Sequence, residues 1–232
     1  YIGAISLWVA CAVQRGCDEA IAVRNSHQNR PSVRSAVSRL NFVPTDNWPQ
    51  ELRDFVQADT ASDMELGITR MLAHAPKAAM GPLQFGAALT VHRTLPERLI
   101  ELMRLRIAFH NQCRSCMAIR YSAAEGSFDE ATACALDQPE IPSNLSKSEQ
   151  LAIDLGDRFA TQHLAIDDDF FERLKVQFTE AEIVELLMHC ALYVGMGRLA
   201  AILDMTEDLP KGFSKPFGES VKLSADTPLS VS

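Results

Sequence analysis

The sequence predicts an all-α protein, and three observations favour this fold class. Apolar residues make up 47% of the 232 positions and aromatic residues 7%, a balance typical of helical proteins. No stretch shows the alternation of β-branched and polar residues that a half-buried strand requires. Capping boxes, in which a hydroxyl residue and a glutamate three positions later satisfy the first free N–H groups of a helix, begin at Ser127, Ser146 and Thr179.

Apolar residues at helical spacing place the individual helices. We expect them at residues 51–57, 64–74, 77–91, 97–109, 113–126, 128–136, 147–162, 168–176 and 180–203. Pro96 is a favourable residue at the start of the fourth helix, and Gly126 is placed to end the fifth. The segment 137–144 is broken by prolines and should form a loop.

Three segments are expected along the chain. Residues 1–47 form an N-terminal extension that should be poorly ordered, because much of it is polar with little reason to fold. Its apolar opening, residues 1–13, is too short to span a bilayer and lacks the basic start of a signal peptide, so we attribute it to a fragmentary or over-extended reading frame. Residues 48–206 form the helical domain, and residues 207–232, interrupted by prolines, form a C-terminal arm.

Charge and composition exclude several functions. A net charge of −8 provides no electrostatic surface for nucleic acid or for an anionic membrane. Six cysteines in a chain of this length do not form a disulfide framework, which favours a reducing, cytoplasmic location. Because the sequence has no phosphate-binding glycine loop, nucleophile elbow or dinucleotide fingerprint, we predict no cofactor.

The candidate chemistry lies in the pair Cys113 and Cys116. The pair stands where one helical pattern ends, near Asn111, and the next begins. A Cys-x-x-Cys at a helix start lowers the pKa of a thiol, since free N–H groups and the helix dipole stabilise the thiolate. Arg114 adds a positive charge, and on a continuous helix Arg120 would lie one turn beyond Cys116 on the same face.

With Glu101 twelve residues before Cys113, and Arg120 four residues after Cys116, this stretch resembles the alkylhydroperoxidase D-like branch of the carboxymuconolactone decarboxylase superfamily. The resemblance implies a helical bundle that associates as a trimer or hexamer. It also implies a peroxiredoxin-like thiol peroxidase or disulfide reductase, in which Cys116 attacks a hydroperoxide, Cys113 resolves the product to a disulfide, and Glu101 helps to move protons. A dithiol protein would then supply the electrons.

The chain departs from the family pattern at one position. The family has histidine where this sequence has Arg120, and arginine does not release its proton near neutral pH. Arg120 remains a candidate for stabilising a thiolate or an anionic substrate. His110, three residues before Cys113, is a candidate for the missing proton relay.

A short internal echo suggests two weakly repeated helical units. Residues 99–102 (LIEL) align with residues 183–186 (IVEL), and Gly197 and Ala200 then align with the two cysteines. Only the first unit would therefore be active. The apolar run 195–203 is either a subunit contact of a homo-oligomer or part of the core.

Alternatives remain open at the level of the sequence. The first is a cofactor-free lyase that acts on a lactone carboxylate, as in the decarboxylases of the superfamily, with Arg106 or Arg120 binding the substrate carboxylate. The second is a non-catalytic helical oligomer. A zinc site would need Cys113, Cys116 and either His110 or His189, but no second close cysteine pair completes it, so we predict no metal. The remaining helical cysteines, Cys134 and Cys190, are expected to be small buried apolar residues.

Overall fold

The computed structural model describes residues 38–121, 130–223 and 229–231, all within one unit that spans Ser35–Ser232. Most of the predicted N-terminal extension lies outside the described residues. The helices of the described part are α2 (Gln50–Phe55), α3 (Asp63–Leu66), α4 (Thr69–Leu72), α5 (Pro76–Val91), α6 (Glu97–Asn111), α7 (Arg114–Ala118), α8 (Glu130–Ala135), α9 (Lys147–Thr161), α10 (Asp168–Gln177) and α11 (Glu180–Leu203). Short 3-10 helices lie at Thr45–Asn47, His163–Ala165 and Lys211–Phe213. The predicted all-α class is confirmed.

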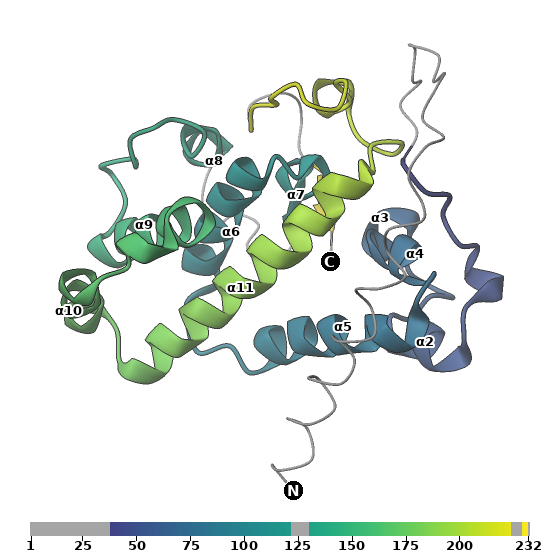
Figure 1. Cartoon of the computed structure of the whole chain (residues 1–232), viewed down its shortest axis with the longest axis horizontal. Coiled ribbons are helices and arrows are strands. Elements are labelled where there is room, and N and C mark those ends of the chain that lie inside the picture. The colour runs from purple at the N-terminus through teal and green to yellow at the C-terminus, as the bar shows by residue number, and fades with distance from the viewer. Residues whose placement is uncertain (1–37, 122–129, 224–228, 232) are drawn as a thin grey trace, which may run out of the picture. The chain divides into compact units, whose positions relative to one another are not determined.

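Helix α6 is the centre of the fold. It packs against α9 on one side and α11 on another, and α11 also contacts α5 and α10 (Figure 1). Helix α11 is long and apolar enough to span a membrane by length and composition, and in the described part of the chain it contacts five helices, α5, α6, α7, α9 and α10. Because α6 carries Glu101 and ends just before Cys113, this packing fixes the position of the candidate site.

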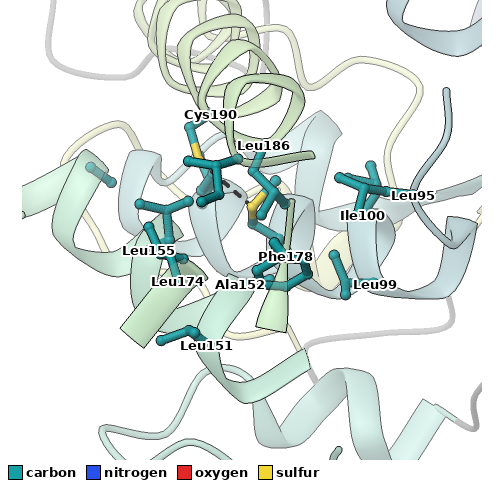
Figure 2. Close-up of a cluster of buried hydrophobic side chains, with 14 of the residues drawn as sticks. Leu95, Leu99, Ile100, Leu151, Ala152, Leu155, Leu174, Phe178, Leu186 and Cys190 are labelled. Atoms are coloured by element: carbon teal, nitrogen blue, oxygen red, sulfur yellow. Dashed lines mark hydrogen bonds between the residues drawn. The ribbon is translucent and has the colours of Figure 1, made fainter. Parts of the chain in front are cut away.

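The main core lies between α6, α9, α10 and α11 (Figure 2). Each helix places an apolar stripe toward the others, and the fully buried members include Met103, Leu155, Leu174, Leu186 and Cys190. Burying each leucine contributes roughly 1.5–3 kcal/mol. The Cys190 thiol lies 3.6 Å from the Met103 sulfur, and burial raises its pKa to about 12, so this cysteine is a packing residue as predicted.

A second core cluster holds the C-terminal segment against the cysteine region. Phe213, Val221 and Leu223 are completely buried in it beside Met117 of α7. Further along, β2 (Leu229–Val231) pairs in parallel with β1 (Ile119–Tyr121) to form a two-stranded sheet. The arm predicted from residue 207 thus packs on its own chain up to residue 223.

The capping boxes mark the helix starts as expected. The hydroxyl of Ser146 accepts from the Glu149 N–H while the Glu149 carboxylate accepts from the Ser146 N–H, and Thr179 and Glu182 repeat this exchange at α11. The Ser127 box lies outside the described residues. A further box that our sequence analysis missed, at Ser62, begins α3.

Two predicted helices are wrong in extent. The helix expected at 64–74 is divided into α3 and α4, because Gly67 has a φ of +41° that a continuing helix does not permit. The helix expected at 113–126 ends at Ala118, because Ile119 enters the β1 strand. Arg120 consequently does not lie on a helical face with Cys116.

Candidate active site

The two cysteines lie on a tight turn between α6 and α7. Gln112 ends α6 with a left-handed backbone (φ 50°). Its side-chain nitrogen donates to the Phe109 carbonyl at 2.8 Å, and its side-chain oxygen accepts from the Val221 N–H at 2.7 Å. Cys113 then caps α7, as the sequence predicts, and its Sγ accepts from the Cys116 N–H at 3.3 Å. The turn is therefore held from both α6 and the C-terminal segment.

Cys113 and Cys116 form a disulfide, with 5.2 Å between their Cα atoms. Cys113 is completely buried, whereas Cys116 is partly buried and lines a cavity. A molecule in the cavity would thus meet Cys116 first. Helix α7 has only five residues, so its dipole is small. A positively charged side chain nearby would therefore stabilise a thiolate more than the helix dipole does.

That charge belongs to Arg104, which connects Glu101 to the cysteine turn. Its guanidinium makes two hydrogen bonds to the Glu101 carboxylate, at 2.5 and 2.6 Å. It also donates to the carbonyls of Cys116 at 2.7 Å and Ile119 at 2.9 Å. Burial alone would lower the pKa of Arg104, but the Glu101 charge and hydrogen bonds outweigh burial and raise it. Glu101 is thus brought to Cys116 through Arg104.

A cavity of about 580 Å³ borders this group. Its polar lining includes Glu101, Arg104, Cys116, Tyr121, His189 and Tyr193. Its apolar lining includes Leu83, Leu89, Ile100, Leu192, Met196 and Met205. Such an apolar pocket with a few convergent polar groups and one reactive sulfur is suited to an organic molecule that reacts at one end.

Arg120 is buried but does not line this cavity. It donates to the carbonyls of Met117 at 2.7 Å and Ile119 at 3.0 Å, and its other nitrogens pair with Glu130 at 2.5 and 3.3 Å. These contacts join β1 to α8. The structure therefore brings Cys113, Cys116 and Glu101 together and leaves Arg120 outside the group.

His110 also lies apart from the cavity lining. Its Nε2 is 2.6 Å from the Asp157 carboxylate of α9, which also accepts from Arg106 at 2.6 Å. Burial acts to raise the pKa of Asp157, but the hydrogen bonds from His110 and Arg106 outweigh it and lower the pKa. Arg106, the other candidate for a substrate carboxylate, further donates to carbonyls of the loop after α8.

Arg104, Tyr121 and Tyr193 line the site although none of them is a candidate from the sequence, and His189 is a candidate there only as a zinc ligand. Arg104 stands three residues after Glu101, a spacing that pairs charges on a helix and was available as a signal. His189 and Tyr193 are four residues apart on α11, so they share a helix face. Only the packing of α11 on α6 shows that this face lines the same cavity as Cys116. Within the described residues, no group of three His, Cys, Asp or Glu side chains is placed to hold a metal ion.

Comparison with known proteins tests the family resemblance. No protein-family model and no curated protein matches the sequence. Among solved structures, the chain is similar to the alkylhydroperoxidase AhpD core structure of an uncharacterized peroxidase-related protein from Ralstonia eutropha JMP134. The TM-score is 0.64 at 15% identity, over 78% of this chain and 96% of that chain. The chain therefore has the alkylhydroperoxidase AhpD-like fold that its cysteine motif predicts.

Proposed function

We propose that the chain is a thiol peroxidase, or disulfide reductase, that reduces hydroperoxides with Cys116 and Cys113. The observation that carries the proposal is the Cys113–Cys116 disulfide at the wall of a largely apolar cavity, with Cys116 as the accessible partner. The neighbouring solved structure is of a peroxidase-related protein, which supports the same reaction class.

The proposed reaction has three steps. The Cys116 thiolate attacks one oxygen of the hydroperoxide, so that an S–O bond forms, the O–O bond breaks and an alkoxide leaves as the alcohol after it gains a proton. The Cys113 thiol then displaces the hydroxyl of the Cys116 sulfenic acid, which releases water and closes the disulfide. A dithiol protein returns two electrons and two protons by exchange.

Arg104 and Glu101 support this chemistry from α6. Arg104 fixes the Cys116 carbonyl and places a positive charge beside the turn, which favours a thiolate in the reduced protein. Glu101 holds Arg104 in place with two hydrogen bonds. We further propose a cytoplasmic location, since a dithiol donor requires a reducing compartment. A homo-oligomer is proposed from the family resemblance alone.

The test is a peptide mass analysis of the reduced protein after brief treatment with tert-butyl hydroperoxide. Wild type should form the Cys113–Cys116 disulfide rapidly. Cys116→Ser should form none, and Cys113→Ser should accumulate a Cys116 sulfenic acid that dimedone traps. Cys134→Ser, which alters a partly exposed cysteine elsewhere, is the matched control and should behave as wild type.

Two outcomes would contradict the proposal. If both thiols stay reduced in wild type, the chain is not a thiol peroxidase, and lactone decarboxylation becomes the activity to assay. If Cys113→Ser rather than Cys116→Ser abolishes reaction with the peroxide, the roles of the two cysteines are reversed.

A further inference from the structure

Two polar side chains in the cavity beside Cys116, His189 and Tyr193, have no role in the reaction proposed above. Each charged residue that lines the cavity already has an ionic or hydrogen-bond partner: Arg70 with Asp208, Arg93 with Glu97, Arg104 with Glu101, Glu65 with Ser62, and Glu207 with the backbone of Ser38 and Thr206. His189 and Tyr193 are neutral and lie on the same face of α11. They are therefore the candidates for an unassigned role.

His189 is the unusual member of the pair. It is 98% buried, with 2% of its surface exposed, and its Nε2 has no hydrogen-bond partner. The nearest charge is the Glu185 carboxylate, 3.9 Å from Nε2 and beyond hydrogen-bond distance. A buried polar atom without a partner costs about 1–3 kcal/mol, so it indicates a ligand or a function at that point.

Tyr193 connects His189 to the cysteine end of the cavity. Its hydroxyl lies 3.2 Å from His189 Nδ1. The phenol is also close enough to Arg104, Glu101 and Tyr121 to interact with them electrostatically. Arg104 in turn holds the Cys116 carbonyl at 2.7 Å. His189, Tyr193, Arg104 and Cys116 thus line one cavity.

We propose that His189 and Tyr193 form a proton shuttle that carries the Cys116 thiol proton to the leaving oxygen of the hydroperoxide, an inference that rests on the proposed function. Neutral His189, bridged by the Tyr193 hydroxyl, accepts the proton as the thiolate forms. After the O–O bond breaks, the same proton passes to the alkoxide and gives the alcohol. The net change is thiol plus hydroperoxide to sulfenic acid plus alcohol, so no outside proton is consumed.

The protonation states suit this role. Burial lowers the pKa of His189, and the Arg93 charge acts in the same direction, while the Glu185 charge opposes them. His189 is therefore a neutral base at neutral pH, and Glu185 stabilises the imidazolium once it forms. Burial raises the pKa of Tyr193, so its hydroxyl stays protonated and can bridge to His189. The Glu101 carboxylate pairs with Arg104 through both of its oxygens.

The experiment compares two reactions of the reduced protein that differ in their leaving group. Oxidation by tert-butyl hydroperoxide needs a proton on the leaving alkoxide, whereas alkylation of Cys116 by iodoacetamide releases iodide and needs none. The variants are Tyr193→Phe and His189→Gln, and His163→Gln in an exposed 3-10 helix is the matched control. Cys134→Ser is the background in all proteins, and the reaction of Cys116 is followed on its own peptide by mass analysis, because Cys11 and Cys17 lie outside the described residues.

We expect Tyr193→Phe and His189→Gln to slow peroxide oxidation at least about tenfold. Alkylation should slow by a clearly smaller factor, because it also needs the thiolate but needs no proton on its leaving group. The pH profile gives a second readout: the oxidation rate of wild type should fall at alkaline pH, where the shuttled proton is lost, and the two variants should lack this fall. His163→Gln should match wild type in every measurement.

Equal slowing of both reactions would mean that the pair only shapes the cavity, and unchanged oxidation would mean that it does not act; either result overturns the shuttle. In both cases wild type still forms its disulfide, so the proposed function survives. If wild type forms no disulfide with the peroxide, the proposed function fails and the shuttle fails with it.

Discussion

Two buried arginines on α6, Arg104 and Arg106, are held in similar ways but face different surroundings. Each pairs with a carboxylate, Glu101 or Asp157, and each also donates to backbone carbonyls. Residues two positions apart on a helix point to nearly opposite sides. Arg104 therefore meets the cysteine turn and the cavity, whereas Arg106 meets α9 and the loop that follows α8.

The difference shows that a buried charge cluster becomes a candidate site only where it borders a cavity and a reactive group. Arg106, Asp157 and His110 form a cluster with the chemical elements of a catalytic group. Yet none of the three lines the cavity that contains Cys116. We infer that this cluster stabilises the packing of α9 on α6, and substitutions in each cluster can separate the two.

The largest effect is expected from Arg104→Met. It leaves the Glu101 carboxylate buried without its partner, which costs about 3–5 kcal/mol in the free energy of unfolding. It also removes the donors to the Cys116 and Ile119 carbonyls, so disulfide formation with peroxide should slow more than about tenfold. Urea unfolding and stopped-flow oxidation measure the two effects.

A double variant, Glu101→Leu with Arg104→Met, separates them. Stability should largely return, because apolar side chains of similar volume replace the buried pair, while the oxidation rate should stay low. Arg173→Met, which breaks an exposed pair with Asp154, is the control and should cost less than about 1 kcal/mol. Recovery of the rate together with stability would show that Arg104 has no part in the chemistry.

Asp157→Asn should produce a smaller loss, of stability alone. The amide keeps the shape of the carboxylate but loses charge-assisted hydrogen bonds to Arg106 and His110, at a cost of about 2 kcal/mol near neutral pH. The oxidation rate of the folded protein should not change. A rate that falls with Asp157→Asn would join the two clusters into one site.

The pH dependence of this loss has a defined sign. The pKa of Asp157 lies below its ordinary value of 3.8 in the folded protein. The carboxylate therefore contributes stability above about pH 3.8, and this contribution disappears as the pH falls through the lower folded value. Urea unfolding at a series of pH values should show wild type and Asp157→Asn converging on the acid side. A constant difference would show that the loss comes from packing.

Much of the fold follows from local sequence signals. Ser146 and Thr179 mark helix starts, the apolar period of α6 stops at Asn111, and Cys113 caps the following helix, all as expected. The cysteine pair and Glu101 also pointed to the correct fold. The helix starts and ends depend on residues within a few positions of one another, so periodicity and capping chemistry are sufficient to find them. Glu101 and the cysteines pointed to the fold only through the family resemblance.

The position of Arg120 could not be found in this way. The pattern from Met117 onward is compatible with a helix, but β1 pairs with Leu229–Val231, more than a hundred residues later in the chain, and so takes Ile119 out of the helix. A long-range strand pairing of this kind leaves no local signal. The sequence likewise cannot predict that His189 and Tyr193 line the same cavity as Cys116, because this depends on how α11 packs.

The structure shows what the second copy of the short internal repeat, residues 183–186, does. Glu185, the counterpart of Glu101, accepts hydrogen bonds from the N–H groups of Thr94 and Leu95 and from the Thr94 hydroxyl, so it anchors the segment before α6. A Cβ atom at Gly197, the counterpart of Cys113, would lie 2.5 Å from the Asn111 side chain. The second unit thus uses its glutamate for packing, and a side chain at residue 197 would require Asn111 to move.

The smallest effect is expected from His110→Gln, and it decides between the two histidines. Glutamine can still donate to Asp157, so the loss of stability should be about 1 kcal/mol or less. If the cluster of Arg106, Asp157 and His110 is structural, His110→Gln should oxidise with the rate and pH profile of wild type, in contrast to His189→Gln. A tenfold slower oxidation in His110→Gln, with alkylation of Cys116 unchanged, would instead place the proton relay at His110, as the sequence alone suggested, and would require the cysteine turn to move toward Asp157 during the reaction.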